Sequence, residues 1–208
     1  MTDYSVTRST QAVTPRGVAV AEARRVARPN GWWGMAVFVA TEATLFGTLV
    51  GTYFYLRFRT PQWPPHGVPE PNLVVPLVLT GVLVLTSIPM QLAFASASRG
   101  RLNAARLALL VALIVQSGYL AMQIHLYLDD LHTFSPNATA YASIYFALVG
   151  AHHFHVLVGI LLNVWLLLRF VGGLTNYRLV ALQATTFYWH FINVLAVVVT
   201  LTQVSPKL

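Results

Sequence analysis

The segment GWWGMAVFVATEATLFGTLVGTYFYL, Gly31–Leu56, predicts both an element of the fold and a candidate site. Its only charged residue is Glu42, and roughly 20 apolar residues are enough for a helix to cross a bilayer. A carboxylate near the bilayer centre costs about 3 kcal/mol or more, so it is usually paired, protonated or turned toward a protected interior. We therefore take Glu42 as a candidate functional residue. The alternative is a purely structural carboxyl that hydrogen-bonds a neighbouring helix.

The composition places the chain in the class of membrane proteins. Of its 208 residues, 56% are hydrophobic and 9% are charged, whereas globular domains carry about 25% charged residues. Because cysteine is absent, disulfides, thiolate metal sites and thiol nucleophiles are excluded. The net charge of +7 comes from basic residues that flank apolar runs, where they act as topology signals. Nucleic acid is therefore not expected as a partner.

Five apolar runs follow one another, and each is long enough to span a bilayer. They predict an all-α fold, a polytopic membrane protein built as a bundle of five transmembrane helices over residues 32–208. Residues 1–31 are predicted to form a flexible cytoplasmic tail, and Pro89 should kink the second span. The predicted spans are Trp32–Phe58, Leu73–Ala97, Ala104–Leu128, Ala140–Phe170 and Leu179–Val204.

Basic residues set the predicted orientation. Five arginines in the tail, three around the second connection and two in the fourth all lie on one side of a five-span protein. The other side has Arg57, Arg59 and Lys207, together with Asp129 and Asp130. The positive-inside rule then places the N-terminus in the cytoplasm and the C-terminus outside. The basic residues on the predicted cytoplasmic side are Arg8, Arg16, Arg24, Arg25, Arg28, Arg99, Arg101, Arg106, Arg169 and Arg178.

Helical spacing separates two faces of the first span. One face carries only small residues, which let helices approach closely and so predict a docking face. Glu42 lies well away from it, with Phe38 and Leu45, and should point inward. One chain does not reveal whether the docking partner is another span or another subunit. The predicted docking face consists of Ala36, Ala40, Ala43, Gly47 and Gly51.

The other spans each carry a line of polar residues. Such residues most often form hydrogen bonds between helices, worth about 0.6 kcal/mol each. Histidines in these lines can also pair with Glu42 or hold a lipid headgroup, and His152 and His155 are the predicted partners of Glu42. We expect interhelical or lipid contacts from Gln123, Gln183, His190 and Asn193.

A metal or haem site in this chain is not expected. His152 and His155 share a helical face, but the Glu-x-x-His motif of di-iron bundles is absent from the sequence. A stand-alone ion channel or transporter is a remote alternative, because intramembrane carboxylates mark ion pathways. Broken helices and inverted repeats, which are typical of transporters, are not evident.

Three segments resemble subunit III of the haem–copper terminal oxidases, and they occur in the order found in that family. WGMAVFVATEATLF followed by YFYLR resembles the opening of its third helix. SIYFALVGAHHFHVLVG resembles its Gly-x-His-x-x-His-Val-x-x-Gly segment, at Gly150, His152, His155, Val156 and Gly159. ALQATTFYWHFINV resembles its Tyr-Trp-His-Phe segment, and it adds Tyr188 and Trp189 to the expected lipid or interhelical contacts.

The sequence departs from the family pattern in places. It lacks the first two of seven spans, as five-span bacterial members do, and Gln183, Asn193 and Leu126 stand where many members carry acidic residues. The resemblance implies a bacterial inner-membrane protein without catalytic residues or metal of its own. Such a subunit binds phospholipid, packs on a catalytic subunit I beside subunit II, which hold the haem and copper, and supports proton uptake and durable turnover. An accessory protein of a nitric oxide reductase or quinol oxidase is the alternative.

Overall fold

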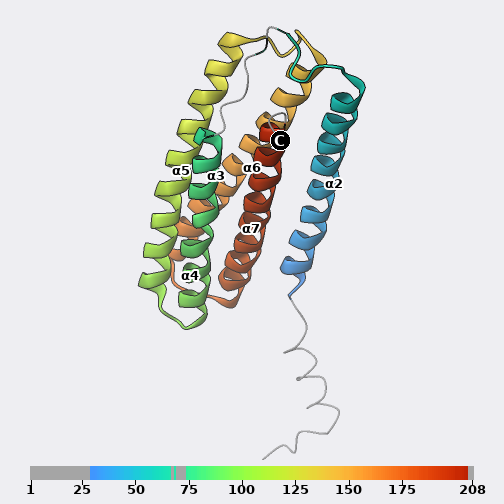
Figure 1. Cartoon of the computed structure of the whole chain (residues 1–208). Helices are drawn as coiled ribbons and strands as arrows, with labels where there is room; N and C mark the ends of the chain where they lie inside the picture. Colours follow the sequence, from blue (N-terminus) through green and yellow to red (C-terminus); the bar gives the residue numbers. More distant parts are fainter. Residues whose placement is uncertain (1–28, 67, 69–73, 206–208) are drawn as a thin grey trace, which may run out of the picture.

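The computed structural model describes residues 29–66, 68 and 74–205, and within them it contains helices and turns. Five helical spans cross the molecule side by side as an all-α bundle (Figure 1). All five are long and apolar enough to cross a membrane, so the predicted fold is confirmed. Most of the predicted tail, residues 1–28, lies outside the described residues. The helices are α2 (Asn30–Arg59), α3 (Val74–Leu85), α4 (Ser87–Ser98), α5 (Leu102–Thr133), α6 (Ala140–Phe170) and α7 (Asn176–Val204).

Helices α3 and α4 together form the second span, which is interrupted at Thr86. Pro89 explains this break, because it has no N–H to donate to the Leu85 carbonyl and its ring would collide with that carbonyl. Thr86 N bonds instead to Leu83 O at 3.0 Å, a tighter 3₁₀-type turn. The predicted distortion at Pro89 therefore appears as a one-residue interruption.

Helices α5 and α7 are longer than the sequence predicted. Helix α5 continues through Asp129 and Asp130 to Thr133, because Asp130 Oδ2 accepts a 2.6 Å hydrogen bond from Tyr145 Oη on α6. Helix α7 begins at Asn176, since the hydroxyl of Thr175 accepts from Arg178 N and so caps the helix. A prediction from hydropathy places the end of a span at the first charged residues. Here hydrogen bonds to polar partners extend the helices beyond that point.

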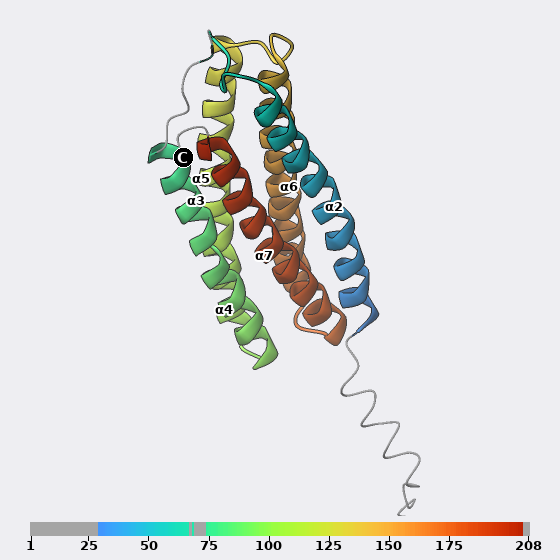
Figure 2. The ribbon, with the colours of Figure 1, turned by 45° about the vertical axis from the view of Figure 1, so that its right-hand side comes forward.

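Helix α7 is the centre of the bundle. It contacts α2, α3, α4 and α6, whereas α2 contacts only α6 and α7 among the described elements. Figure 2 shows α2 as an outer helix beside α6 and α7, with α3 and α4 on the opposite side of α7. Fourteen α7 residues are buried by the rest of the chain, including Tyr188, Trp189, Ile192 and Asn193.

The contact between α6 and α7 depends on Gly159. A Cβ atom at this position would lie 2.6 Å from Trp189 Cζ3 and 3.0 Å from Ile192 Cδ1. Both neighbours are fully buried, and neither ring nor branched side chain can move without displacing other core atoms. Gly159 therefore allows the two helices to lie at this separation.

We expect Gly159→Ala to destabilise the bundle by about 1–3 kcal/mol, the usual range for overpacking a core. Thermal unfolding of the purified protein in detergent measures the effect. Gly118→Ala is the matched control, because it lies within α5 with open space around its Cβ position and should be neutral or slightly stabilising. Equal unfolding temperatures for the two variants would contradict the proposed role of Gly159.

Candidate functional site: a carboxyl–imidazole pair inside the bundle

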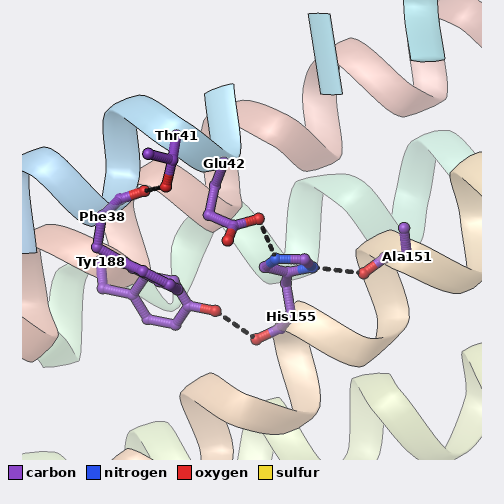
Figure 3. A network of polar contacts seen from close by, with 6 residues as sticks. All are labelled: Phe38, Thr41, Glu42, Ala151, His155 and Tyr188. Atoms are coloured by element: carbon purple, nitrogen blue, oxygen red, sulfur yellow. Dashed lines mark hydrogen bonds and ion pairs between the residues drawn. The ribbon is translucent and has the colours of Figure 1, made fainter. Parts of the chain in front are cut away.

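Glu42 on α2 and His155 on α6 lie face to face inside the bundle (Figure 3). Glu42 Oε2 is 2.8 Å from His155 Nε2, and the two side chains are 18% and 9% exposed. The Phe46 ring and the imidazole pack in a T-shaped arrangement, with ring centroids 5.2 Å apart. The structure thus places the carboxyl in a largely apolar, enclosed setting with one titratable partner.

The other contacts of His155 restrict how this pair can hold its protons. His155 Nδ1 is 2.7 Å from the backbone oxygen of Ala151, and a carbonyl can only accept, so Nδ1 carries a hydrogen. Nε2 then either accepts from a protonated Glu42 or, as imidazolium, donates to a carboxylate. Both arrangements give the pair a net charge of zero, which lowers the cost of keeping it inside a membrane.

Tyr188 on α7 completes this arrangement. Its hydroxyl donates to the backbone oxygen of His155 at 3.3 Å, and its ring lies 5.9 Å from that of Phe38 on α2. Figure 3 shows the Tyr188 hydroxyl and the Glu42 carboxyl approaching His155 from different helices. Three spans therefore meet at one histidine. Tyr188 holds its backbone, and the contacts to Ala151 and Glu42 hold its two ring nitrogens.

The structure brings His155, and not His152, into contact with Glu42. His152 is also buried, at 3% exposed, but both of its ring nitrogens lack a hydrogen-bond partner within the described part of the chain. The two residues are three apart on α6, and the ring of His152 neighbours that of His153, with centroids 5.9 Å apart. Sequence spacing put both histidines on one face, and the rotation of α6 against α2 decides between them.

A second polar cluster joins the second span to α7. Asn193 Nδ2 donates to Ser87 Oγ at 2.6 Å, Ser87 Oγ lies 3.1 Å from His190 Nδ1, and His190 Nε2 lies 3.3 Å from Gln91 Oε1. With Nε2–H donating to Gln91, Nδ1 of a neutral His190 accepts from the Ser87 hydroxyl. Every member is then neutral, and the chain of hydrogen bonds ties the two helices together.

The remaining predicted polar residues behave differently from one another. Trp189 Nε1 donates to Thr86 Oγ1 at 2.8 Å and so links α7 to the break in the second span. Gln123 donates to Tyr119 Oη, one turn earlier on its own helix, rather than to another span. Gln183 is half-buried and makes no side-chain hydrogen bond within the described residues.

The predicted docking face of α2 turns away from the rest of this chain. Ala40, Ala43, Gly47 and Gly51 are exposed, and Ala36 is half-buried. Apart from its own helical backbone and its two chain neighbours, a Cβ atom at Gly47 or Gly51 would meet no atom within 4 Å. The small-residue face therefore does not pack against another span of the same chain.

Two contacts were not anticipated from the sequence. Arg106, read only as a topology signal, donates to the backbone oxygen of Phe170 at the end of α6, and Tyr145 binds Asp130. The sequence signal for Arg106 was its position inside the apolar run, one turn past the start of α5. Within the described residues, no cluster of three or more His, Cys, Asp or Glu could hold a metal ion.

The sequence of this chain matches a known protein family. Residues 21–203 match the family described as Cytochrome c oxidase subunit III. The chain is 28% identical over 190 residues to a probable cytochrome c oxidase subunit 3 of Nocardia farcinica, covering 89% of this chain and 93% of that protein. It is 29% identical over 167 residues to quinol oxidase subunit 3 of Bacillus subtilis, covering 79% of each.

A longer relative shows the same match over part of its length. Cytochrome c oxidase subunit 3 of Homo sapiens is 27% identical over 169 residues, which cover 78% of this chain and 64% of the human protein. Together with the five long apolar helices, these matches identify a multi-pass membrane protein. The chain belongs to the cytochrome c oxidase subunit III family and is subunit III of a haem–copper oxidase.

Proposed function

We propose that this chain is a non-catalytic subunit that docks on the catalytic subunit of its oxidase through α2 and stabilises it. In this proposal, haem and copper belong to partner subunits I and II, and this chain contributes packing, bound phospholipid and support for proton uptake. The observation that carries the proposal is the outer face of α2. In the most apolar 18-residue stretch of α2, only 6% of the residues are buried by the chain itself, whereas the corresponding share is 50% in α6 and 61% in α7.

The chemistry of this face suits a close helix–helix contact. Small residues permit close approach of two backbones, and Gly47 and Gly51 have open space beside them. The flanking hydroxyls are already satisfied, because Thr44, Thr48 and Thr52 each donate to the carbonyl four residues earlier at 2.9–3.0 Å. A partner helix can therefore cover the face without leaving these hydroxyls unpaired.

The Glu42–His155 pair supports a role in proton handling. Its members can exchange a proton across a 2.8 Å contact without changing the net charge of the pair, and intramembrane carboxylates of this kind mark proton relays.

Quinol is an alternative to cytochrome c as the electron donor of the complex, since one of the relatives is a quinol oxidase subunit. We therefore propose an oxidase complex that uses either cytochrome c or quinol.

We expect replacement of Gly47 and Gly51 by Leu to weaken assembly, because four-carbon side chains would hold a partner helix away from α2. The purified oxidase should then contain less of this chain per haem and lose activity sooner over repeated turnovers, while its haem content and initial oxygen consumption persist. Gly118→Leu on α5 is the matched control, since it also projects into open space within this chain. Undiminished assembly and lifetime would exclude α2 as the docking face, and haem bound by this polypeptide itself would exclude the non-catalytic role.

We expect Glu42→Leu to cost about 1–3 kcal/mol in unfolding free energy, because it leaves His155 Nε2 buried without a partner. Glu42→Gln should cost less, since an amide can still donate to Nε2. A cycle with His155→Leu should show coupling of at least about 0.5 kcal/mol, whereas Glu42→Leu and His190→Leu, which belong to separate clusters, should be additive. Thermal unfolding of the four single variants and the two double variants measures these terms; additivity of Glu42→Leu with His155→Leu would mean that the contact contributes nothing.

We propose the bacterial inner membrane as location, with the N-terminus in the cytoplasm. The basic residues around the connection from α4 to α5 carry this orientation. The chain has no native cysteine, so single cysteines can be labelled from either side. A membrane-impermeant thiol reagent added outside intact cells should label Asn137→Cys and leave Ser98→Cys unlabelled until the membrane is opened; both positions are exposed at opposite ends of the bundle. The reverse pattern would invert the orientation.

A further inference from the structure

Arg106 has a charge that nothing in the described part of the chain neutralises. Its Nη2 donates to the backbone oxygens of Phe170 at 2.6 Å and Val171 at 3.4 Å, and its Nη1 to Asn103 Oδ1 at 3.4 Å. All three acceptors are neutral, and the ion pairs found among the described residues involve other side chains. The guanidinium is thus held in place at the end of α6 without a counter-ion.

Beside this guanidinium lies an apolar groove between α5 and α6. It has a volume of about 530 Å³ and is lined by Arg106, Leu107, Leu110, Leu167 and Val171. Leu110 is one turn further along α5, about 5–6 Å deeper along the axis. The groove therefore carries one positive group near the helix ends and hydrocarbon side chains toward the middle of the bundle, which is the polarity of a phospholipid.

We propose that this groove binds an anionic phospholipid, with its phosphate on Arg106 and an acyl chain against Leu110 and Leu167. The proposal rests on the lipid binding proposed above, and it gives that binding a place and a headgroup class. Charge complementarity favours an anionic headgroup, because a guanidinium forms charge-assisted hydrogen bonds to phosphate oxygens. Asn103 engages one of the two N–H groups of Nη1, so the other remains for a phosphate oxygen, whereas Nε is buried and has no partner within the described residues.

The position of the side chain is an advantage for binding. The hydrogen bond to Phe170 O already fixes the guanidinium, so a ligand does not have to order a flexible arginine. The leucines that line the groove are substantially exposed, 63% for Leu107 and 46% for Leu110. An inorganic phosphate ion would leave these side chains uncovered, whereas an acyl chain covers them. The groove is also separate from α2, which does not contact α5.

Three variants of the full chain test the site. Arg106→Gln removes the charge, and Leu110→Trp fills the groove while leaving Arg106 and its bond to Phe170 in place. Arg169→Gln is the matched control: Arg169 lies in the last turn of α6 near the same end, is exposed and stacks over the Trp165 ring at 5.8 Å, but it does not line the groove. Each protein, in whatever complex it purifies, is incubated with phosphatidylglycerol or phosphatidylcholine, and lipid retained on this chain is measured by native mass spectrometry.

We expect the unchanged chain and Arg169→Gln to retain phosphatidylglycerol in preference to phosphatidylcholine. Arg106→Gln should lower its retention about fivefold, the factor that corresponds to about 1 kcal/mol for one basic residue near an anionic surface, and Leu110→Trp should lower it as well. Unchanged retention in Arg106→Gln or Leu110→Trp, or an equal loss in Arg169→Gln, would overturn the proposal. Displacement of the lipid by millimolar inorganic phosphate would overturn it too, because the site would then be one for a free anion. Since lipid is counted on this chain, the result does not depend on whether oxidase subunits co-purify.

Discussion

The indole of Trp189 is the contact on which the arrangement of the spans depends. Its ring lies over Gly159 of α6, and its Nε1 donates to Thr86 Oγ1 where the second span is interrupted. One fully buried side chain therefore contacts α6 at its glycine and also holds the break between α3 and α4 against α7. The neighbouring Tyr188 then reaches the backbone of His155, so the geometry of the candidate site follows from the same turn of α7.

The polar side chains along the spans stabilise this packing by forming hydrogen bonds between helices. In a bilayer, polar side chains have no water to bind, so they pair with one another across helices. Thr80 and Thr200 lie 2.6 Å apart, and Asn163 Nδ2 donates to Gln116 Oε1 at 3.0 Å. Such bonds are individually weak, about 0.6 kcal/mol each, but each one restricts the rotation of its two helices. Together they specify which faces meet, while apolar contacts alone would tolerate several rotations.

The spans could be predicted from the sequence because the bilayer sets the length and hydropathy that a helix needs to cross it, whatever its neighbouring helices are. The bounds of α6 were predicted correctly, whereas α5 extends beyond Leu128, because its end depends on the tertiary bond between Asp130 and Tyr145. The choice of His155 over His152 likewise could not be predicted. Both lie on one face of α6, and only the docking of α2 brings Glu42 to one of them.

Helix α2 combines two requirements that are normally separate. Toward the bundle it presents Glu42, which pairs with His155, and away from the bundle it presents small residues with open space beside them. A partner helix packed on the outer face would press α2 against α6 and α7, the only described elements that α2 contacts. The geometry of the Glu42–His155 pair would then depend on the docked state. If α2 docks as proposed, a packing contact on the outside of the subunit and the carboxyl–imidazole contact inside it would be coupled through this one helix.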